Sequence, residues 1–330
     1  MYKSQLELNV ISLKEQSPDE VVDIKDFIKD EEVYSEGARQ KASFVMPEGI
    51  DAKYKFCLPS WRYMFKQSRS GFPIQFLIEV FAYQLGSLIG IPVPPAFVSI
   101  DGNTHVYGAL IEWFYDDRQD VFFPGGNFMH LFIENFEHRR GREHNFQTFL
   151  AILKSFNTNI DLVLKCWAKV VIFDAIIGNT DRHQSNWGLI IKKGKTADPS
   201  PKTFELSPAY DNGTSMGYVL SEKDLLKYSD LKELDKYISS GRPHMKWTLE
   251  ENWNQRLSHE DFITQMITSY PFVRDDMLSS LQFSDLQVKN ILDQFDKFNI
   301  SVKISEARSA FMMNLVTRRK ERLLSIIGGK

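Results

Sequence analysis

The sequence predicts an α+β fold in two lobes, a small amino-terminal lobe of residues 1–115 and a larger, mainly helical lobe of residues 116–330. Three observations support this prediction. The chain of 330 residues is longer than one hydrophobic core usually serves. Short apolar runs of strand character cluster before residue 115, whereas most later segments have the 3.6-residue period of helices. A polar, glycine-rich segment, DDRQDVFFPGGN, separates the two regions at residues 116–127.

Composition excludes several classes of protein. Apolar residues make up 43% of the chain and charged residues 25%, which predicts a folded globular protein and not a disordered one. The net charge of -3 supplies no general attraction to nucleic acid, so direct nucleic-acid binding is not expected. The only cysteines, Cys57 and Cys166, lie among apolar residues and cannot form a disulfide framework, which indicates a cytoplasmic location. No signal peptide is recognisable, and no apolar run approaches the roughly 20 residues of a membrane span.

The elements of the small lobe are predicted in order. Residues 15–36 are acidic and are expected to form a solvated edge or a partner-binding segment. Aromatic runs in residues 54–66, broken at Pro59, predict a strand pair closed by a turn. The segment PIQFLIEVFAYQLGSLIG has apolar residues at helical spacing and predicts a helix that ends at Gly90. The runs AFVSI and VYGALIEWF then predict two strands joined by a turn at residues 101–103.

The large lobe is predicted to contain a long helix that Asp161 caps and that ends at Gly178, and a final helix after Ser305. Two clusters of basic residues lie in this lobe, at residues 138–144 and 318–322. We interpret both as solvated helix faces, with substrate docking or RNA contact as the alternative.

Two polar loops of the large lobe contain residues suited to catalysis. The first runs from Asn179 to Asn186, directly after the long helix, and the second contains Asp211. Both adjoin apolar strand-like runs, so we expect Asp181, Asn186 and Asp211 to come together. Two carboxylates about 4 Å apart repel by roughly 4 kcal/mol at an effective dielectric near 20, so converging carboxylates usually share a cation or a proton. A ligand set of oxygen atoms alone favours magnesium over zinc.

The spacing of these residues indicates phosphoryl transfer. Asp181 and Asn186 are separated by the same interval as the Asp and Asn of the protein-kinase catalytic loop, in which Asp accepts the proton of the substrate hydroxyl and Asn holds a metal. Asp211 stands where the second metal-binding Asp would be. The sequence therefore predicts ATP and Mg²⁺ as cofactors, with Asp181 as the catalytic residue and Asn186 and Asp211 as metal ligands. The alternative is a capped helix end followed by two Asx turns.

The segments GNTDRHQSNWG and LSPAYDNG together resemble the HipA-type serine/threonine kinases. This resemblance implies a two-lobed, protein-kinase-like fold. It also implies that Lys66 is the phosphate-binding lysine and that Glu79, in a helix followed by GIPVP, supports it. The alternatives for these two residues are a solvent-facing strand lysine and an ordinary solvated helix residue.

The resemblance extends to other parts of a nucleotide site. Residues 36–41 are similar to the loop that covers the nucleotide phosphates in this family, and residues 111–114 to the stretch that contacts adenine. The family's loop begins with a serine that can be autophosphorylated, whereas here the order Ser35-Glu36-Gly37 departs from that pattern. His183 is expected to contact nucleotide or to order its own loop. The full set of expected nucleotide-binding residues is Gly37, Ala38, Arg39, Gln40, Lys41, Lys66, Glu79, Glu112, Trp113, Phe114, His183 and Tyr210.

The function that the residues and the resemblance predict is transfer of the γ-phosphate of ATP to a Ser or Thr hydroxyl of a protein. The resemblance allows a translation-related substrate and a toxin-like role restrained by an antitoxin or regulatory partner, in a short form without the family's additional amino-terminal subdomain. Two alternatives stay open. Lipid kinases share the Asp-Arg-His-x-x-Asn loop, so a phosphoinositide kinase is one. A nucleotide-binding pseudokinase that acts as an interaction module is the other.

Overall fold

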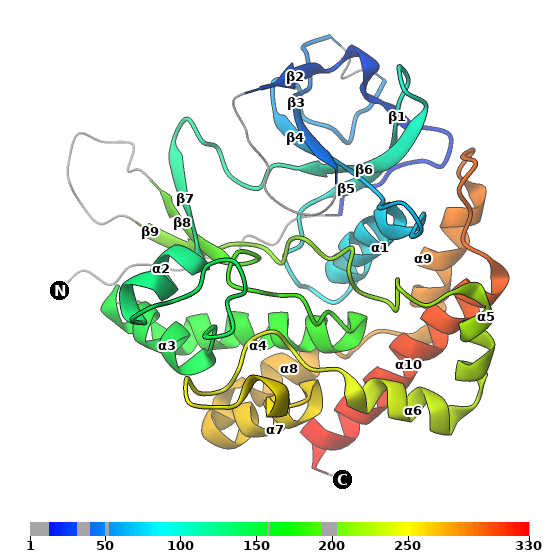
Figure 1. The fold of residues 1–330 in the computed structure, drawn as a ribbon. Helices are drawn as coiled ribbons and strands as arrows, with labels where there is room; N and C mark the ends of the chain where they lie inside the picture. Colours follow the sequence, from blue (N-terminus) through cyan, green and yellow to red (C-terminus); the bar gives the residue numbers. More distant parts are fainter. Residues whose placement is uncertain (1–12, 32–39, 50–52, 157–158, 193–202, 330) are drawn as a thin grey trace.

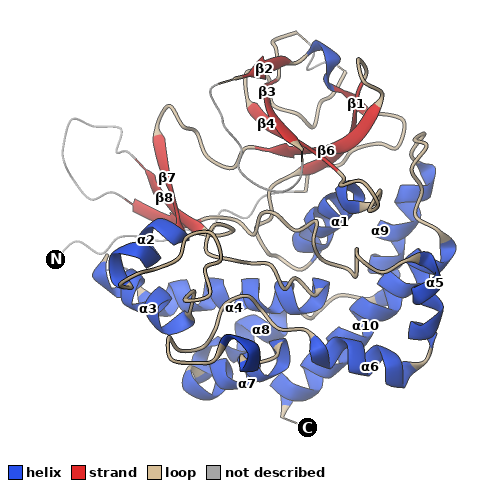
Figure 2. Cartoon of the chain, in the orientation of Figure 1, coloured by secondary structure: helices blue, strands red, loops and turns tan. Residues whose placement is uncertain are grey.

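The computed structural model describes residues 13–31, 40–49, 53–156, 159–192 and 203–329 (Figure 1). A curved sheet lies on one side of the molecule and a body of helices on the other, as Figure 2 shows. The predicted α+β class is therefore confirmed. The main hydrophobic core is continuous, running from the inner face of the sheet through helix α1 into the helical body.

The large sheet is mostly antiparallel. Its strand order is β1-β5-β6-β4-β3-β2, and only β1 and β5 run parallel. The expected strands of residues 96–100 and 106–114 are present as a hairpin, β5 and β6. The strands are β1 (Val22–Asp23), β2 (Ile28–Asp30), β3 (Lys41–Val45), β4 (Arg62–Gln67), β5 (Ala96–Asp101) and β6 (Val106–Glu112), with a short 3₁₀ turn, η1 (Ile24–Asp26), after β1.

The prediction of a strand at residues 54–58 is wrong. This segment forms turns, with the Cys57 amide donating to the Tyr54 carbonyl at 2.8 Å. Its aromatic side chains instead fill a second, smaller core on the outer face of the sheet, together with Tyr63 and Phe97. Strand β4 pairs with β3 and β6 in its place. The apolar run therefore reflects burial and not strand pairing.

Helix α1 (Gln75–Leu88) is the predicted helix of the small lobe. It lies between the inner face of the sheet and helix α9 (Asp285–Lys297), which explains why most of its residues are buried (Figure 1). It ends as expected, because Gly90 has a left-handed backbone at φ 70° and the Ile91 amide donates to the Gly86 carbonyl at 2.8 Å.

Helix α4 (Ile160–Ile177) runs through the helical body. The predicted cap is wrong by two residues: the Asn159 side chain accepts the Leu162 amide, whereas Asp161 lies within the first helical turn. The predicted end is confirmed, because Gly178 adopts the left-handed conformation at φ 64°. The other helices are α2 (Gly125–Phe132), α3 (Phe146–Ser155), α5 (Glu222–Leu225), α6 (Leu231–Ser240), α7 (His259–Ser269), α8 (Arg274–Ser279) and α10 (Glu306–Gly328), with 3₁₀ turns η2 (Leu226–Ser229), η3 (Trp253–Gln255) and η4 (Pro271–Val273).

A second sheet was only partly expected. It consists of β7 (Asp120–Pro124), β8 (Gly188–Lys192) and β9 (Thr203–Leu206), in that order and antiparallel. Strand β7 lies within residues 116–127, which were expected to be a connection after the last strand of the small lobe. Its Val and Phe residues pair with β8. The β8–β9 hairpin connects the two polar loops. Among the described helices, none has the length and apolar character needed to cross a bilayer.

Candidate functional site

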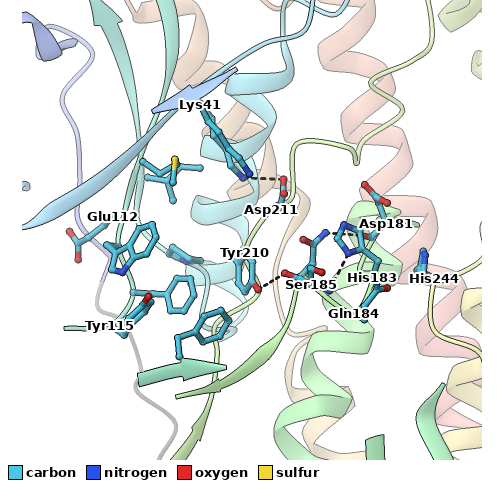
Figure 3. A pocket seen from close by; sticks show the side chains of 18 of the residues that line it. Lys41, Glu112, Tyr115, Asp181, His183, Gln184, Ser185, Tyr210, Asp211 and His244 are labelled. Atoms are coloured by element: carbon cyan, nitrogen blue, oxygen red, sulfur yellow. Dashed lines mark hydrogen bonds and ion pairs between the residues drawn. The ribbon is translucent and has the colours of Figure 1, made fainter. Parts of the chain in front are cut away.

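A cleft of about 960 Å³ lies between the large sheet and the helical body. Lys41 and Lys66 line it from the sheet, and Asp181, Asn186 and Asp211 line it from the polar loops. Figure 3 shows Glu112 and Tyr115 at one end, Asp181 and His183 at the other, and Asp211 between them. The structure thus brings the two polar loops and the predicted lysine to one cleft.

The first polar loop is ordered by its own hydrogen bonds. The Asn179 side chain accepts the Asp181 amide at 2.9 Å, and the Asp181 carbonyl accepts the His183 amide at 2.7 Å. The Asn186 side chain donates to that same carbonyl at 2.7 Å. These bonds hold Asp181 and Asn186 beside each other, as the sequence predicts, and leave the Asp181 carboxylate to line the cleft.

Lys66, Glu79 and Asp211 form a connected group of charges. The Lys66 ammonium lies 3.3 Å from one Glu79 oxygen and 3.0 Å from Asp211. The other Glu79 oxygen accepts the Asn212 amide at 2.9 Å. Lys66 and Glu79 are buried, so Lys66 is not a solvent-facing strand lysine and Glu79 is not an ordinary solvated helix residue. Asp211 has a left-handed backbone at φ 59°, a conformation that Asp tolerates better than most residues.

Electrostatics at the Asp181 end of the cleft follow from burial. Burial raises the pKa of Asp181 and the charge of Asp211 acts in the same direction, whereas the protonated form of His183 opposes the rise. Burial lowers the pKa of His183, which favours a neutral imidazole. Its Nδ1 atom accepts the Ser185 amide at 3.1 Å, so His183 orders its own loop.

Aromatic rings form the opposite end of the cleft. The rings of Phe114 and Tyr210 stack with their centroids 5.0 Å apart, and Phe122 packs edge-on against Phe114. The Tyr210 hydroxyl donates to the Ser185 carbonyl at 2.6 Å, which connects this wall to the first polar loop. A flat apolar wall of this kind matches the face of a planar, heterocyclic base.

Glu112 and Trp113 make bonds within the protein. The Glu112 carboxylate accepts bonds from Lys14 at 2.5 Å and from the Tyr63 hydroxyl at 3.3 Å. The backbone amides of Glu112 and Trp113 donate to the carbonyls of Pro95 and Arg62. These two amides therefore hold the chain segment in place and are not directed at a ligand.

Arg182, for which the sequence suggested only substrate or phosphate contact, connects the two polar loops. Its buried guanidinium donates to both oxygens of Asp174 at 2.6 and 3.0 Å and to the Asn212 side chain at 2.8 Å, and it also bonds the Tyr210 carbonyl. Burial raises the pKa of Asp174, and the bonds from Arg182 act against this rise. The signal in the sequence was a lone carboxylate, Asp174, within the apolar run VVIFDAII.

Two further residues near Asp181 were also missed. The Thr214 hydroxyl donates to the Asp181 carboxylate at 3.5 Å, and the charge of Arg69 acts against the rise in the pKa of Asp181. Thr214 follows Asp211 in the second polar loop, where the sequence already indicated a site. Arg69 comes from a loop of the small lobe whose local sequence indicates none.

Part of the predicted nucleotide site is seen. Lys41 lines the cleft, and the Gln40 carbonyl accepts the Gln67 amide at 3.0 Å at the start of the β3–β4 pair. Ser35, Gly37, Ala38 and Arg39 lie outside the described residues.

The residues at this cleft fit magnesium better than zinc. Across the described ranges, no group of three or more His, Cys, Asp or Glu side chains is arranged as a metal site. Asn186 and Asp211 offer one amide oxygen and one carboxylate, which suits a Mg²⁺ ion that keeps several waters and takes its remaining ligands from phosphates.

Comparisons with known proteins agree with this geometry. The family model described as HipA-like C-terminal domain matches residues 34–297. The serine/threonine-protein kinase CtkA of Helicobacter pylori strain J99 is 21% identical over 190 residues, which are 57% of this chain and 54% of that protein, so the match spans about half of the relative's length.

Two solved structures are similar in fold. The crystal structure of the Helicobacter pylori proinflammatory kinase CtkA has a TM-score of 0.71 at 16% identity, covering 94% of this chain and 97% of that one. HipA of Shewanella oneidensis MR-1, solved as a toxin–antitoxin complex with HipB and operator DNA, has a TM-score of 0.50 at 12% identity, covering 91% and 68%. The chain therefore has a kinase-like fold.

Proposed function

Because the chain belongs to the HipA-like C-terminal domain family, we propose that it is an ATP- and Mg²⁺-dependent serine/threonine protein kinase. One observation carries the proposal: Asp181, Asn186 and Asp211 line the same cleft as a lysine that is paired with a buried glutamate. Phosphoryl transfer depends on positioning and on neutralisation of charge, and this cleft offers residues for both.

Each residue has a distinct role in the proposal. Asp181 holds the Ser or Thr hydroxyl and accepts its proton as the hydroxyl oxygen bonds the γ-phosphorus and the bond to ADP breaks. Lys66, held by Glu79, binds the phosphates of the nucleotide. Magnesium held by Asn186 and Asp211 would neutralise phosphate charge. Arg182 keeps the two loops in register through Asp174 and Asn212.

The nucleotide would lie across the cleft. Phe114 and Tyr210 would form the wall against which the adenine packs, and residues 112–114 would offer their remaining backbone groups to its edge. Gln40 and Lys41, with Gly37, Ala38 and Arg39, would cover the phosphates. The division into lobes of residues 1–115 and 116–330, with the cleft between them, is part of this proposal.

The similarity to a curated serine/threonine-protein kinase supports a protein substrate. The HipA of Shewanella oneidensis is in a complex with HipB, which supports an antitoxin or regulatory partner for this chain. A translation-related substrate is also part of the proposal, and it rests only on the resemblance to the HipA-type kinases. The two cysteines are buried free thiols, and this supports the cytoplasm as the compartment.

The test is transfer of label from γ-labelled ATP with Mg²⁺ to three acceptors: the chain itself, a mixed Ser/Thr peptide library and phosphatidylinositol vesicles. We expect label on Ser or Thr of protein or peptide, and its loss with EDTA and in Asp181→Asn. Label on lipid alone would replace the proposal with a lipid kinase. Binding of ATP and Mg²⁺ without transfer to any acceptor would replace it with a pseudokinase.

A further inference from the structure

The cleft has basic residues at its Asp181 end that the proposed phosphoryl transfer does not use. His138, Arg139 and Arg140 line the cleft, as do His183, Gln184 and His244. The Gln184 side chain bonds the His138 carbonyl, which places these basic residues beside the first polar loop. Figure 3 shows His183, Gln184 and His244 grouped beside Asp181, opposite the end that holds Tyr115. The basic residues belong to segment 133–145, which connects α2 to α3 as a series of turns. The predicted solvated helix face is therefore wrong for this cluster.

Gln184 holds this segment against the first polar loop. The buried side chain of Gln184 donates to the His138 carbonyl at 2.6 Å, and the backbone carbonyl of Gln184 accepts the amide of Gly126, in α2, at 2.7 Å. Gly141 has a left-handed backbone at φ 54°, and a Cβ atom there would lie 1.8 Å from the Gln184 side-chain oxygen. Glycine therefore permits the close approach that brings the segment beside Asp181.

His244 lines the cleft beside Arg140. Its ring packs edge-on against that of His183, with the ring centroids 5.8 Å apart. Burial lowers the pKa of His244 to about 3, so its imidazole is neutral at physiological pH. The bond from Gln184 to the His138 carbonyl and the bond from the Gly141 amide to the Glu137 carbonyl at 2.8 Å fix the backbone of residues 137–141. The arginine side chains are exposed to solvent and line the cleft.

The arginines are not neutralised by nearby carboxylates. Within the described residues, Arg139 has no carboxylate at ion-pair distance, and Arg140 has one, Glu137, at 3.7 Å with both side chains largely exposed. An exposed pair of this length contributes little. Glu137 and Glu143 belong to the same segment but do not line the cleft. The cleft beyond Asp181 therefore presents positive charge from Arg139 and Arg140.

Resting on the proposed kinase activity, we infer that Arg139 and Arg140 bind an anionic side chain of the protein substrate, a carboxylate or a phosphate, within three residues of the acceptor Ser or Thr. An extended peptide advances about 3.3 Å per residue, so such a side chain lies up to about 10 Å from the acceptor hydroxyl at Asp181. Guanidinium groups bind carboxylates and phosphates through paired, charge-assisted hydrogen bonds.

A peptide fits this end of the cleft better than nucleic acid does. The net charge of the chain is -3, and the same cleft contains the carboxylates of Asp181 and Asp211. Nucleic-acid binding needs an extended positive surface that neutralises many phosphates, whereas two arginines suit one or two acidic side chains.

The experiment measures phosphorylation of four matched Ser peptides that carry Ala, Asp, phosphoserine or Lys at the positions flanking the acceptor. The variants are Arg139→Ala/Arg140→Ala, the charge reversal Arg139→Glu/Arg140→Glu, and the control Arg142→Ala. Arg142 is exposed in the same segment but does not line the cleft. All of these side chains are exposed, so thermal unfolding should be close to that of the wild type.

We expect the wild type to phosphorylate the acidic peptides with a kcat/KM about tenfold above that of the Ala peptide, mainly through KM. The double alanine variant should lose this ratio, the charge reversal should favour peptides with flanking Lys, and Arg142→Ala should keep the wild-type ratio. A higher rate with phosphoserine than with Asp would identify phosphate as the recognised group, and the reverse would identify carboxylate.

Equal kcat/KM for acidic and neutral peptides in the wild type would overturn the inference and leave the kinase proposal standing. The same ratio in the double alanine variant as in the wild type, or its loss in Arg142→Ala, would also overturn it. Binding of a labelled RNA oligonucleotide that depends on Arg139 and Arg140, with peptide preference unchanged, would replace the inference with an RNA interface. No transfer to any peptide would refute the kinase proposal and this inference together.

Discussion

Replacement of Glu79 tests the buried charge group most sharply. One Glu79 oxygen lies 3.3 Å from the Lys66 ammonium and the other accepts the Asn212 amide at 2.9 Å, and Glu79 is 3% exposed. Glu79→Ala removes the acceptor for a buried amide and one carboxylate from a buried lysine. Breaking a buried ion pair costs about 3–5 kcal/mol. Glu79→Gln loses the charge but keeps an oxygen that can accept the Asn212 amide, so its cost should be about half.

These costs convert to shifts in Tm. The entropy of unfolding of 330 residues is about 0.7 kcal/mol per kelvin, so a loss of 3 kcal/mol lowers Tm by about 4 °C. We expect about 4 °C for Glu79→Ala and about 2 °C for Glu79→Gln, measured by scanning calorimetry. The matched control is Glu250→Ala, an exposed glutamate, which should change Tm by less than 1 °C.

The same variants should affect catalysis. Lys66 would retain Asp211 at 3.0 Å but lose the carboxylate on α1, so its ammonium should be poorly placed for phosphates. We expect kcat/KM for ATP to fall at least about tenfold in Glu79→Ala. A Tm within 1 °C of the wild type, together with unchanged kcat/KM, would refute the reasoning from the Lys66–Glu79–Asn212 contacts.

The remaining predictions concern catalysis, pH and packing. Asp181→Asn should lower kcat by about 10²–10⁴-fold while an ATP titration shows binding retained; a kcat near the wild-type value would exclude Asp181 as the base. Because burial raises the pKa of Asp181 and the base must be ionised, wild-type kcat/KM should rise with pH, with its acid limb centred above the ordinary value near 3.9. Hydrogen bonds, the strongest from Arg318, lower the pKa of Asp235 to about 2. The ionised Asp235 therefore stabilises the folded protein above about pH 4, and this stabilisation is lost as the pH falls towards about 2 and the carboxylate is protonated. The Tm difference between wild type and Asp235→Asn should therefore be about 1–2 °C at pH 7 and shrink below pH 4. Gly141→Ala should lower Tm by several degrees in thermal denaturation, since its Cβ would overlap the Gln184 side chain, and an unchanged Tm would contradict that packing.

The elements predicted correctly are those whose signals are local. Helix α1 and the end of α4 follow from apolar periodicity and from glycines at positions of positive φ. The β5–β6 hairpin follows from two apolar runs around a turn. The two polar loops were recognisable because the spacing of Asp181 and Asn186 is itself the signal.

The errors arise where tertiary burial overrides local pattern. Residues 54–58 are apolar because they cover the outer face of the sheet, and one sequence cannot distinguish that burial from strand pairing. The prediction that the basic cluster at residues 318–322 forms a solvated helix face is wrong for the same reason. Arg318 and Arg322 instead pair with Asp235 and Glu260, and Arg319 is buried, donating to the Ile176 carbonyl at 3.1 Å.

Arg182 shows why a site is harder to predict than its motif. Its partners lie eight residues before it and thirty residues after it, on helix α4 and on the second loop. The spacing of catalytic residues within a loop is encoded locally, whereas the contacts that hold two loops together depend on how the helix and the hairpin pack.

Quantitative phosphoproteomics of the native host cells tests the central claim most directly, comparing wild type with Asp181→Asn at equal protein levels. The proposal that Asp181 serves phosphoryl transfer to protein Ser or Thr predicts new phosphoserine or phosphothreonine sites with the wild type alone. Identical phosphosite maps for the two proteins, with ATP binding intact in both, would contradict it.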